Sequence, residues 1–114
     1  MNDPVSQFFD AVERQDWGAL APLCAPDFAV WQNLTDRSRD LDGVVRFLQR
    51  VVETYGALHY TDRRRYDAPG AVTVQQTIGY ADRGLTVPAC MVCTLAADGR
   101  LARIDEYMDS RAFA

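Results

Sequence analysis

Apolar residues follow a helical spacing in the first part of the chain. Asp3-Pro4 is a favourable helix start, with Asp as N-cap and Pro at the first helical position. The residues that follow recur three and four positions apart and form one apolar face: Val5, Phe8, Phe9 and Val12. A second, short helix is predicted around Leu20, Leu23 and Cys24, and residues 25–27 end it.

The longest predicted helix begins at Asp42. Gly56 stands at a suitable C-cap position, because glycine adopts the left-handed conformation that often ends a helix. Between them the apolar residues form a broad stripe: Val44, Val45, Phe47, Leu48, Val51, Val52 and Tyr55. A stripe this broad indicates a helix that lies against a sheet.

Alternating apolar and polar positions predict strands in the rest of the chain. A short strand is expected over residues 28–31, and the polar residues 32–40 are interpreted as a loop. Longer strands are expected over residues 59–66, 71–80 and 85–95. Gln76 is the exception on the otherwise apolar face of its strand. Helices first and strands afterwards indicate an α+β domain with an antiparallel sheet, covered by the helices on one face. The other face is mixed in character and is either solvated or paired with a second copy.

The last strand carries the main candidate for chemistry. Asp98-Gly99 is a hairpin turn signal, and the residues after it alternate. Glu106 shares a face with Ala102, Ile104 and Met108, while Leu101, Arg103, Asp105 and Tyr107 fall on the other face. Two interpretations stay open for Glu106. Either it reaches solvent at the strand end, or it lies in an apolar pocket, where desolvation raises its pKa and suits it to proton transfer.

Composition and charge exclude several function classes. The 114 residues suffice for one domain, residues 1–114, and contain no apolar run near the ~20 residues of a membrane span. The net charge of −4 argues against nucleic acid as a partner. All twelve basic residues are Arg, so lysine chemistry is excluded, and His59 is the single histidine. The N-terminus shows no secretory signal, so a cytoplasmic protein is expected.

The three cysteines, Cys24, Cys90 and Cys93, are an odd number and indicate reduced thiols. Cys90 and Cys93 have C-x-x-C spacing, but three positions apart on a strand their side chains point to opposite faces. We therefore expect no metal site and no cofactor. The three arginines at 63–65 also alternate faces, so either one of them points inward or the run forms a solvated edge.

With this order of elements, the chain resembles the SnoaL-like branch of the nuclear transport factor 2-like (cystatin-like) superfamily. The segments that carry the resemblance are the opening FFDAVERQDWGALAPLCAPDFAVW, Asp42-Gly43 and the closing DGRLARIDEYMD. The resemblance extends over residues 8–113. It implies a cone-shaped α+β fold, with a curved antiparallel sheet wrapped around a long helix, two N-terminal helices, and a pocket at the wide end.

Ketosteroid isomerases of this superfamily use a Tyr on the first helix and two Asp residues on or near the strands. The resemblance aligns Phe8, Gln32 and Met91 with these positions. None of the three can transfer a proton, because Phe lacks the hydroxyl and Gln and Met do not titrate usefully. The ketosteroid isomerase mechanism is therefore not expected.

Limonene-epoxide hydrolases hold a water with a Tyr and an Asn, supported by an Asp–Arg–Asp relay. Residues 31–33 resemble the Tyr-x-Asn segment with Trp in place of Tyr, and Gln76 and Ile78 stand where Arg and one Asp are expected. The resemblance implies that Asn33 and Glu106 hold one water, with Glu106 as base and Gln76 as its orienting partner. Polyketide-cyclising members need one acidic residue in the pocket for aldol-type proton transfers, and Glu106 again matches.

Two functions follow from these observations. One is a cofactor-independent cyclase, isomerase, dehydratase or hydrolase that uses Glu106, Asn33 and Gln76; the other is a non-catalytic ligand-binding or dimerisation module. In both, we expect a small hydrophobic molecule as ligand and a homodimer formed through the outer sheet face. Trp31 either packs structurally or stacks on a flat ligand. The residues expected to line the pocket are Trp31, Phe8, Tyr55, Val74, Ile78, Tyr80, Met91, Cys93, Ile104 and Met108.

Overall fold

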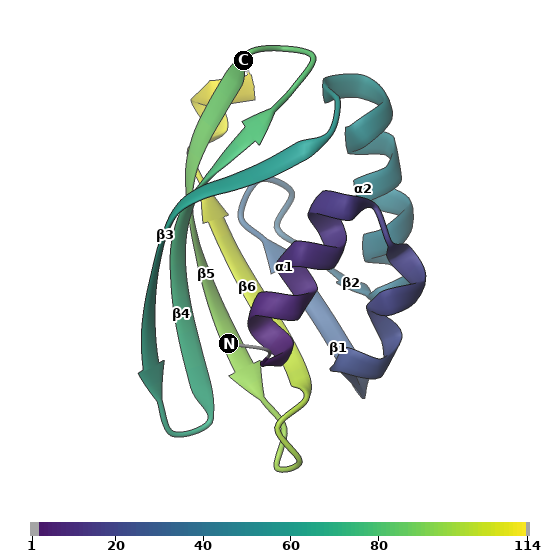
Figure 1. The fold of residues 1–114 in the computed structure, drawn as a ribbon, viewed down its shortest axis with the longest axis vertical. Helices are drawn as coiled ribbons and strands as arrows, with labels where there is room; N and C mark the ends of the chain where they lie inside the picture. The colour runs from purple at the N-terminus through teal and green to yellow at the C-terminus, as the bar shows by residue number, and fades with distance from the viewer. Residues whose placement is uncertain (1–2, 114) are drawn as a thin grey trace.

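The computed structural model describes residues 3–113 and shows an α+β fold built on one six-stranded sheet, in the order β2-β1-β6-β5-β4-β3. Figure 1 shows the helices α1 and α2 on the same side of this sheet. In chain order the elements are α1 (Pro4–Arg14), η1 (Trp17–Ala19), η2 (Ala21–Leu23), β1 (Cys24–Gln32), β2 (Arg37–Asp40), α2 (Leu41–Tyr55), β3 (Leu58–Ala68), β4 (Ala71–Tyr80), β5 (Leu85–Leu95), β6 (Leu101–Met108) and η3 (Ser110–Phe113).

The sheet is mixed, which corrects the prediction of an antiparallel sheet. Strand β1 pairs with β6 in parallel, and every other neighbouring pair is antiparallel. The antiparallel pairs join elements that are close in sequence, whereas β1 and β6 lie at opposite ends of the chain. No tight turn links these two strands, so the local pattern did not fix their relative direction.

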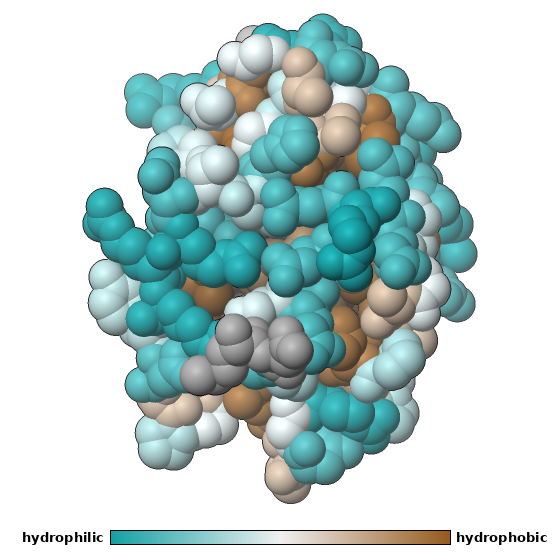
Figure 2. All heavy atoms as spheres, viewed as in Figure 1, coloured by the Kyte–Doolittle hydropathy of each residue, from teal (hydrophilic) through white to brown (hydrophobic). Residues whose placement is uncertain are grey.

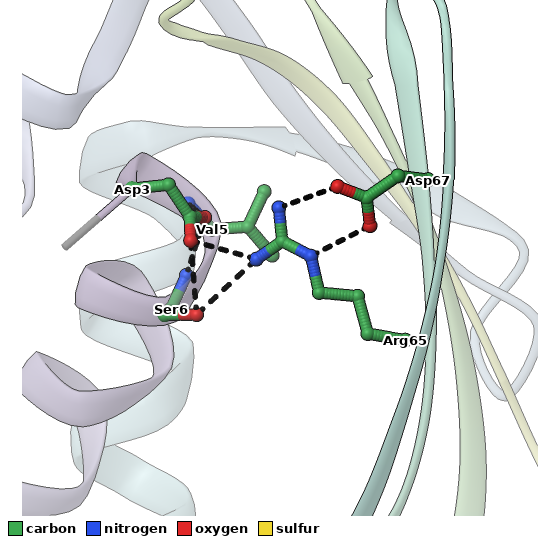
Figure 3. Close-up of polar contacts among 5 residues, drawn as sticks. All are labelled: Asp3, Val5, Ser6, Arg65 and Asp67. Carbon is green, nitrogen blue, oxygen red and sulfur yellow. Dashed lines mark hydrogen bonds and ion pairs between the residues drawn. The ribbon is translucent and has the colours of Figure 1, made fainter. Parts of the chain in front are cut away.

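Helix α1 confirms the helix expected at the N-terminus. The carboxylate of Asp3 accepts hydrogen bonds from the backbone N–H groups of Val5 and Ser6, as an N-cap does. Arg65 of β3 then donates from Nη1 to Oδ2 of Asp3 at 2.8 Å and from Nε to Oδ1 of Asp67 at 2.7 Å. Figure 3 shows this guanidinium between the helix start and the strand. The run at residues 63–65 thus contains an inward-pointing arginine, which ties α1 to β3.

The segment between α1 and α2 differs most from the prediction. In place of a second α-helix, the chain makes two 3-10 turns, η1 and η2, and Cys24 already has extended backbone angles and pairs with Leu101. Pro22 limits helix growth there because it lacks a backbone N–H. Strand β1 therefore starts earlier and runs to Gln32, and β2 occupies part of the predicted loop.

Helix α2 covers the sheet without filling the space beneath it. Asp40 caps its start by accepting a hydrogen bond from the N–H of Gly43 at 2.8 Å, and Gly56 follows its end at φ 89°. Within the described residues, Val44 is the one α2 residue that is buried, whereas Leu48, Val51 and Tyr55 are partly exposed. The apolar stripe of α2 consequently faces both the core and an open space.

The strands confirm most of the expected facing. Val74, Met91 and Cys93 are fully buried on the helix side of β4 and β5, and Gln76 is buried among them. Leu101 is a correction, because it is fully buried instead of facing outward. The pairing of β5 and β6 shifts between Thr94 and Leu95, and such a bulge reverses the side to which the first residue of β6 points.

Over residues 3–113, no helix is both long and apolar enough to cross a bilayer. Figure 2 shows hydrophilic side chains over most of the face that carries α1, with apolar atoms in separate patches.

Candidate functional site

A cavity of about 250 Å³ lies between α2 and the helix-facing side of the sheet. Apolar and aromatic side chains make most of its wall. The polar groups are one carboxamide, one carboxyl group and the hydroxyls of three tyrosines. The lining residues are Gln32, Leu34, Phe47, Leu48, Val51, Tyr55, Leu58, Tyr60, Ile78, Tyr80, Glu106, Met108 and Phe113. Pockets of this kind, mainly apolar with a few convergent polar groups, are typical of small-molecule sites.

Glu106 lies in the wall of this cavity. The parallel pairing of β1 and β6 places it directly beside Gln32, as register partners. Gln32 donates a hydrogen bond from Nε2 to Oε1 of Glu106 at 2.7 Å. Both side chains are largely removed from solvent, with exposures of 7% for Gln32 and 9% for Glu106. The interior thus holds one carboxyl group with one fixed hydrogen-bond donor.

The second carboxyl oxygen of Glu106 faces open space. Every fully buried side-chain nitrogen or oxygen in residues 3–113 has a hydrogen-bond partner. Oε2 of Glu106 has no partner among the described residues, so it is not sealed in the protein and is reachable from the cavity. The same argument applies to the hydroxyl groups of Tyr60 and Tyr80, which also line the cavity. A bound molecule therefore meets one carboxyl oxygen and two phenol hydroxyls that are free to bond with it.

Burial changes how these groups titrate. Desolvation raises the pKa of Glu106 above its ordinary value, and the hydrogen bond from Gln32 partly opposes this rise. Burial and then the negative charge of Glu106 raise the pKa of Tyr60, and the same two causes raise that of Tyr80. The tyrosines consequently stay neutral donors at physiological pH, while Glu106 retains a proton to higher pH than an exposed glutamate.

A smaller void of about 40 Å³ lies deeper, toward α1. It shares Gln32, Phe47, Leu48, Tyr60 and Glu106 with the main cavity and is closed by side chains of α1 and β1. Glu106 therefore stands where the larger and smaller spaces meet.

The structure brings together about half of the residues expected to line a pocket. Tyr55, Ile78, Tyr80 and Met108 line the main cavity, and Phe8 and Ile104 line the smaller void. Val74, Met91 and Cys93 lie in the solid core and line neither space. Trp31 lies on the outer face. Its ring centroid is 5.2 Å from that of Tyr107, and its Nε1 donates a hydrogen bond to Asp36.

Asn33 and Gln76, expected beside Glu106, are occupied elsewhere. Asn33 donates from Nδ2 to the carbonyl of Met108 at 2.9 Å and accepts from the N–H of Met108 at 2.8 Å, so it extends the pairing of β1 and β6. Gln76 accepts a hydrogen bond from Nε of Arg63 at 2.8 Å and does not line the cavity around Glu106. The partner of Glu106 is Gln32 instead.

Sequence reasoning aligned Gln32 with a catalytic position but missed its pairing with Glu106, because the first strand was expected to end at residue 31. With β1 running to Gln32, this residue shares the inward face with Phe28 and Val30 and is its single polar member. The alternation that identified Glu106 would have identified Gln32 as well. Tyr60 lay inside an expected strand but was not singled out, and of the α2 residues that line the cavity only Tyr55 was expected there.

The cavity does not contain the ligands of a metal site. Among the residues that the structure describes, no three His, Cys, Asp or Glu side chains are grouped so that they could hold a metal ion. Burial also raises the pKa of Cys93 to about 12, so this thiol remains protonated and unreactive.

The comparisons with known proteins agree with this architecture. The SnoaL-like domain family matches residues 5–104. No curated protein sequence matches the chain. Among solved structures, a protein of Shewanella putrefaciens provisionally assigned as a SnoaL-like polyketide cyclase is 15% identical over 96% of this chain and 80% of its own, with a TM-score of 0.80.

Two further structures have the same fold. A protein of Xanthomonas campestris provisionally assigned as a polyketide cyclase is 20% identical, covers 96% of this chain and 90% of its own, and has a TM-score of 0.80. TerC, co-crystallised with polyporic acid, is 17% identical over 96% of this chain and 92% of its own, with a TM-score of 0.82. The family match extends over most of the chain and the structures share its fold, so the protein belongs to the SnoaL-like domain family and has the nuclear transport factor 2-like, ketosteroid isomerase-like fold.

Proposed function

We propose that the protein binds a small hydrophobic molecule in the cavity beneath α2 and that Glu106 transfers a proton to or from this molecule. The observation that carries the proposal is the position of Glu106. One of its oxygens is held by Gln32 at 2.7 Å, and the other is open to a largely apolar cavity. A carboxyl group that is desolvated and yet reachable by a ligand suits general acid–base catalysis.

The cavity size and lining indicate the class of ligand. A dry apolar cavity of about 150 Å³ is large enough for benzene, so about 250 Å³ accommodates one or two fused rings. Phe47, Tyr55 and Phe113 supply aromatic surface for such rings. Glu106, Tyr60 and Tyr80 supply hydrogen bonds, so the ligand carries a carbonyl or hydroxyl group on its ring system.

Proton abstraction next to a carbonyl group is the reaction that these groups support. Ionised Glu106 takes a proton from the carbon beside the carbonyl. The electron pair of that C–H bond forms the C=C bond of an enolate, and the π pair of the carbonyl moves to its oxygen. Neutral Tyr60 or Tyr80 donates a hydrogen bond to the oxygen as it becomes negative. Protonated Glu106 then gives its proton to a different carbon of a conjugated enolate, which completes an isomerisation. In an aldol cyclisation the enolate carbon instead attacks a second carbonyl, and the alkoxide that forms takes the proton from Glu106. The assignments of the relatives as polyketide cyclases support this class of chemistry.

Hydrogen–deuterium exchange provides a test that does not require the natural substrate. The probe is 2-tetralone, a two-ring ketone, dissolved in D₂O with the protein, and NMR follows the loss of its protons beside the carbonyl. We expect exchange to slow by about 100-fold or more in Glu106→Gln, a typical contribution of a positioned acid–base group. Glu53→Gln, an exposed change on α2, serves as the matched control and should exchange at the wild-type rate. Equal rates in the two variants would contradict the catalytic role.

A second function, ligand binding without chemistry, is favoured by one observation. The proposed water-holding residue Asn33 is bonded to the backbone of Met108 and does not line the cavity. Glu106 therefore has an amide as its partner, and no second carboxyl group among the described residues lines the cavity to share a proton with it. If 2-tetralone binds, as seen in amide chemical shifts around the cavity, but its exchange is not accelerated over buffer, the protein acts as a binding module.

A further inference from the structure

Arg39 of β2 reaches the pair of Gln32 and Glu106 from the edge of the sheet. Its Nη1 donates a hydrogen bond to Oε1 of Gln32 at 3.2 Å. The guanidinium carbon lies 4.2 Å from the ring centroid of Phe47 on α2, in a cation–π contact. The side chain is thus held between α2 and the end of β1, and a continuous chain of hydrogen bonds runs from Arg39 through Gln32 to Glu106.

This chain fixes the orientation of the Gln32 carboxamide. An amide group has one acceptor oxygen and one donor nitrogen, and either end could in principle face the carboxyl group. A guanidinium has only donors, so the end that faces Arg39 must be the oxygen. The nitrogen is then directed at Glu106, where it stabilises the ionised carboxylate. Without Arg39, the amide could turn and present its oxygen, which bonds to a protonated carboxyl group only.

We propose that Arg39 is a positioning residue that keeps the Gln32 amide in the orientation that donates to Glu106. This inference deepens the proposed function and rests on it, because it concerns how readily Glu106 becomes a base. Arg39 acts through Gln32, since no hydrogen bond joins it to the carboxyl group directly.

The other groups that face Glu106 are neutral at physiological pH. They are Gln32 from β1, Tyr60 from β3, Tyr80 from β4 and the thiol of Cys93 from β5; Tyr55 of α2 lines the same cavity. Among the described residues, Glu106 is the one charged side chain that lines the cavity, so no other arginine there can hold the Gln32 amide in place of Arg39.

Arg37 offers a matched control on the same strand. It is the register partner of Gln32 across β1 and β2, and its charge lies close enough to Arg39 to lower the pKa of that guanidinium, after burial. It is exposed and makes no hydrogen bond to Gln32. Arg37→Met and Arg39→Met therefore remove the same charge from the same strand, but only the second removes the contact with the amide.

The test is the titration of Glu106 by ¹³C NMR, with labelled glutamate, at 0.15 M salt. The chain has three glutamates, Glu13, Glu53 and Glu106, so the spectrum is simple to assign. We expect the pKa of Glu106 to rise by about one pH unit in Arg39→Met, the scale of one lost hydrogen bond to a charged group. It should stay within a few tenths of a unit of wild type in Arg37→Met and in Arg39→Lys, which retains a donor.

The outcomes separate this inference from the proposed function. If Glu106 of the wild-type protein titrates as an exposed glutamate does, the proposed function is contradicted whatever Arg39 does. If its pKa is raised but shifts equally in Arg39→Met and Arg37→Met, the positioning role is wrong and the proposed function stands. A measurement on the wild type needs no variant: the Gln32 side-chain amide protons should shift as Glu106 titrates, and unchanged amide signals would overturn the inference.

Discussion

Gln32 and Glu106 are separated by 74 positions in the sequence and are joined by a hydrogen bond of 2.7 Å across the parallel strands β1 and β6. The hydrogen bond thus involves a buried, ionisable group. Burial raises the pKa of Glu106, and a raised pKa in the native state determines how the free energy of unfolding changes with pH.

We expect Glu106 to make the native state less stable as the pH rises. In the unfolded chain a glutamate titrates near 4.3, and the native protein keeps its proton to higher pH. Between these two values the native state binds more protons than the unfolded state, so the free energy of unfolding falls with increasing pH. The contribution is fully present below about pH 4.3 and is lost as the pH rises through the native value.

Glu106→Gln removes this titration and retains the shape of the side chain. Its free energy of unfolding, relative to wild type, should therefore increase between pH 4 and pH 8, as measured by urea unfolding with wild type and variant side by side. Glu53→Gln, on the exposed face of α2, should show no such trend. A difference between Glu106→Gln and wild type that does not change with pH would contradict a raised pKa.

Gly56 after α2 occupies a position that other residues cannot adopt without strain. Its backbone angles are φ 89° and ψ −179°, a region populated almost only by glycine, and an added Cβ would lie 2.6 Å from atoms of Asp82. We expect Gly56→Ala to lower the free energy of unfolding by roughly 2–4 kcal/mol, from the backbone strain together with the clash.

Gly70 provides the comparison for this effect. It also has a positive φ, 73°, but an added Cβ there meets nothing within 4 Å. Gly70→Ala should therefore cost only the backbone strain, about 1 kcal/mol. If thermal or urea unfolding shows that both variants lose the same free energy of unfolding, the contact with Asp82 does not contribute to the effect at Gly56.

The ion pair that joins α1 to β3 should contribute modestly to stability. Arg65 is partly buried and bridges Asp3, the N-cap of α1, and Asp67 (Figure 3). We expect Arg65→Met to lower the free energy of unfolding by about 1 kcal/mol and to increase amide exchange in the first turn of α1. Arg64→Met changes the same charge at an exposed neighbour and should have almost no effect.

Local sequence patterns fixed much of the fold because the main elements carry strong periodicity. The strands Ala71–Tyr80 and Leu85–Leu95 have the bounds that alternation predicts, and α2 begins within a residue of its predicted start. Strand β2 was missed because its residues, Arg37–Asp40, are all polar, and what makes them a strand is pairing with β1. Pairing between distant segments leaves no periodic signal in a short polar stretch.

Glu106 and part of the cavity lining were predictable from the sequence, whereas the hydrogen-bond partner of Glu106 was not. Glu106 interrupts an apolar face, which a single strand reveals. Its partner depends on the parallel pairing of β1 with β6, and this pairing is a property of the whole sheet. Trp31 illustrates the same limit, since placing it near the pocket required knowing which face of β1 is turned inward.

The outer sheet face is our proposed site of homodimer formation. Tyr66 and Tyr107 lie on it as the exposed large hydrophobic residues of the described chain, at 56% and 49% exposure. We expect a dimer in sedimentation experiments at micromolar protein, and Tyr107→Arg should shift it toward monomer. Gln49→Arg, on the exposed side of α2, introduces the same charge away from this face and should leave the dimer intact. A wild-type protein that sediments only as monomer would contradict the proposal.

Filling the cavity should abolish ligand binding while the fold persists. Val51 lines the cavity from α2 and is partly exposed, so Val51→Trp directs a large ring into the space of about 250 Å³ without displacing the solid core. The neighbouring Val52 does not line the cavity, and Val52→Trp adds the same side chain one position along the helix. We expect 2-tetralone to perturb the amide signals of β4 and β6 in wild type and in Val52→Trp. In Val51→Trp, binding should weaken by at least tenfold, because the ring occupies the volume that the ligand requires. Circular dichroism establishes that both variants remain folded, and undiminished binding in Val51→Trp would place the ligand site elsewhere.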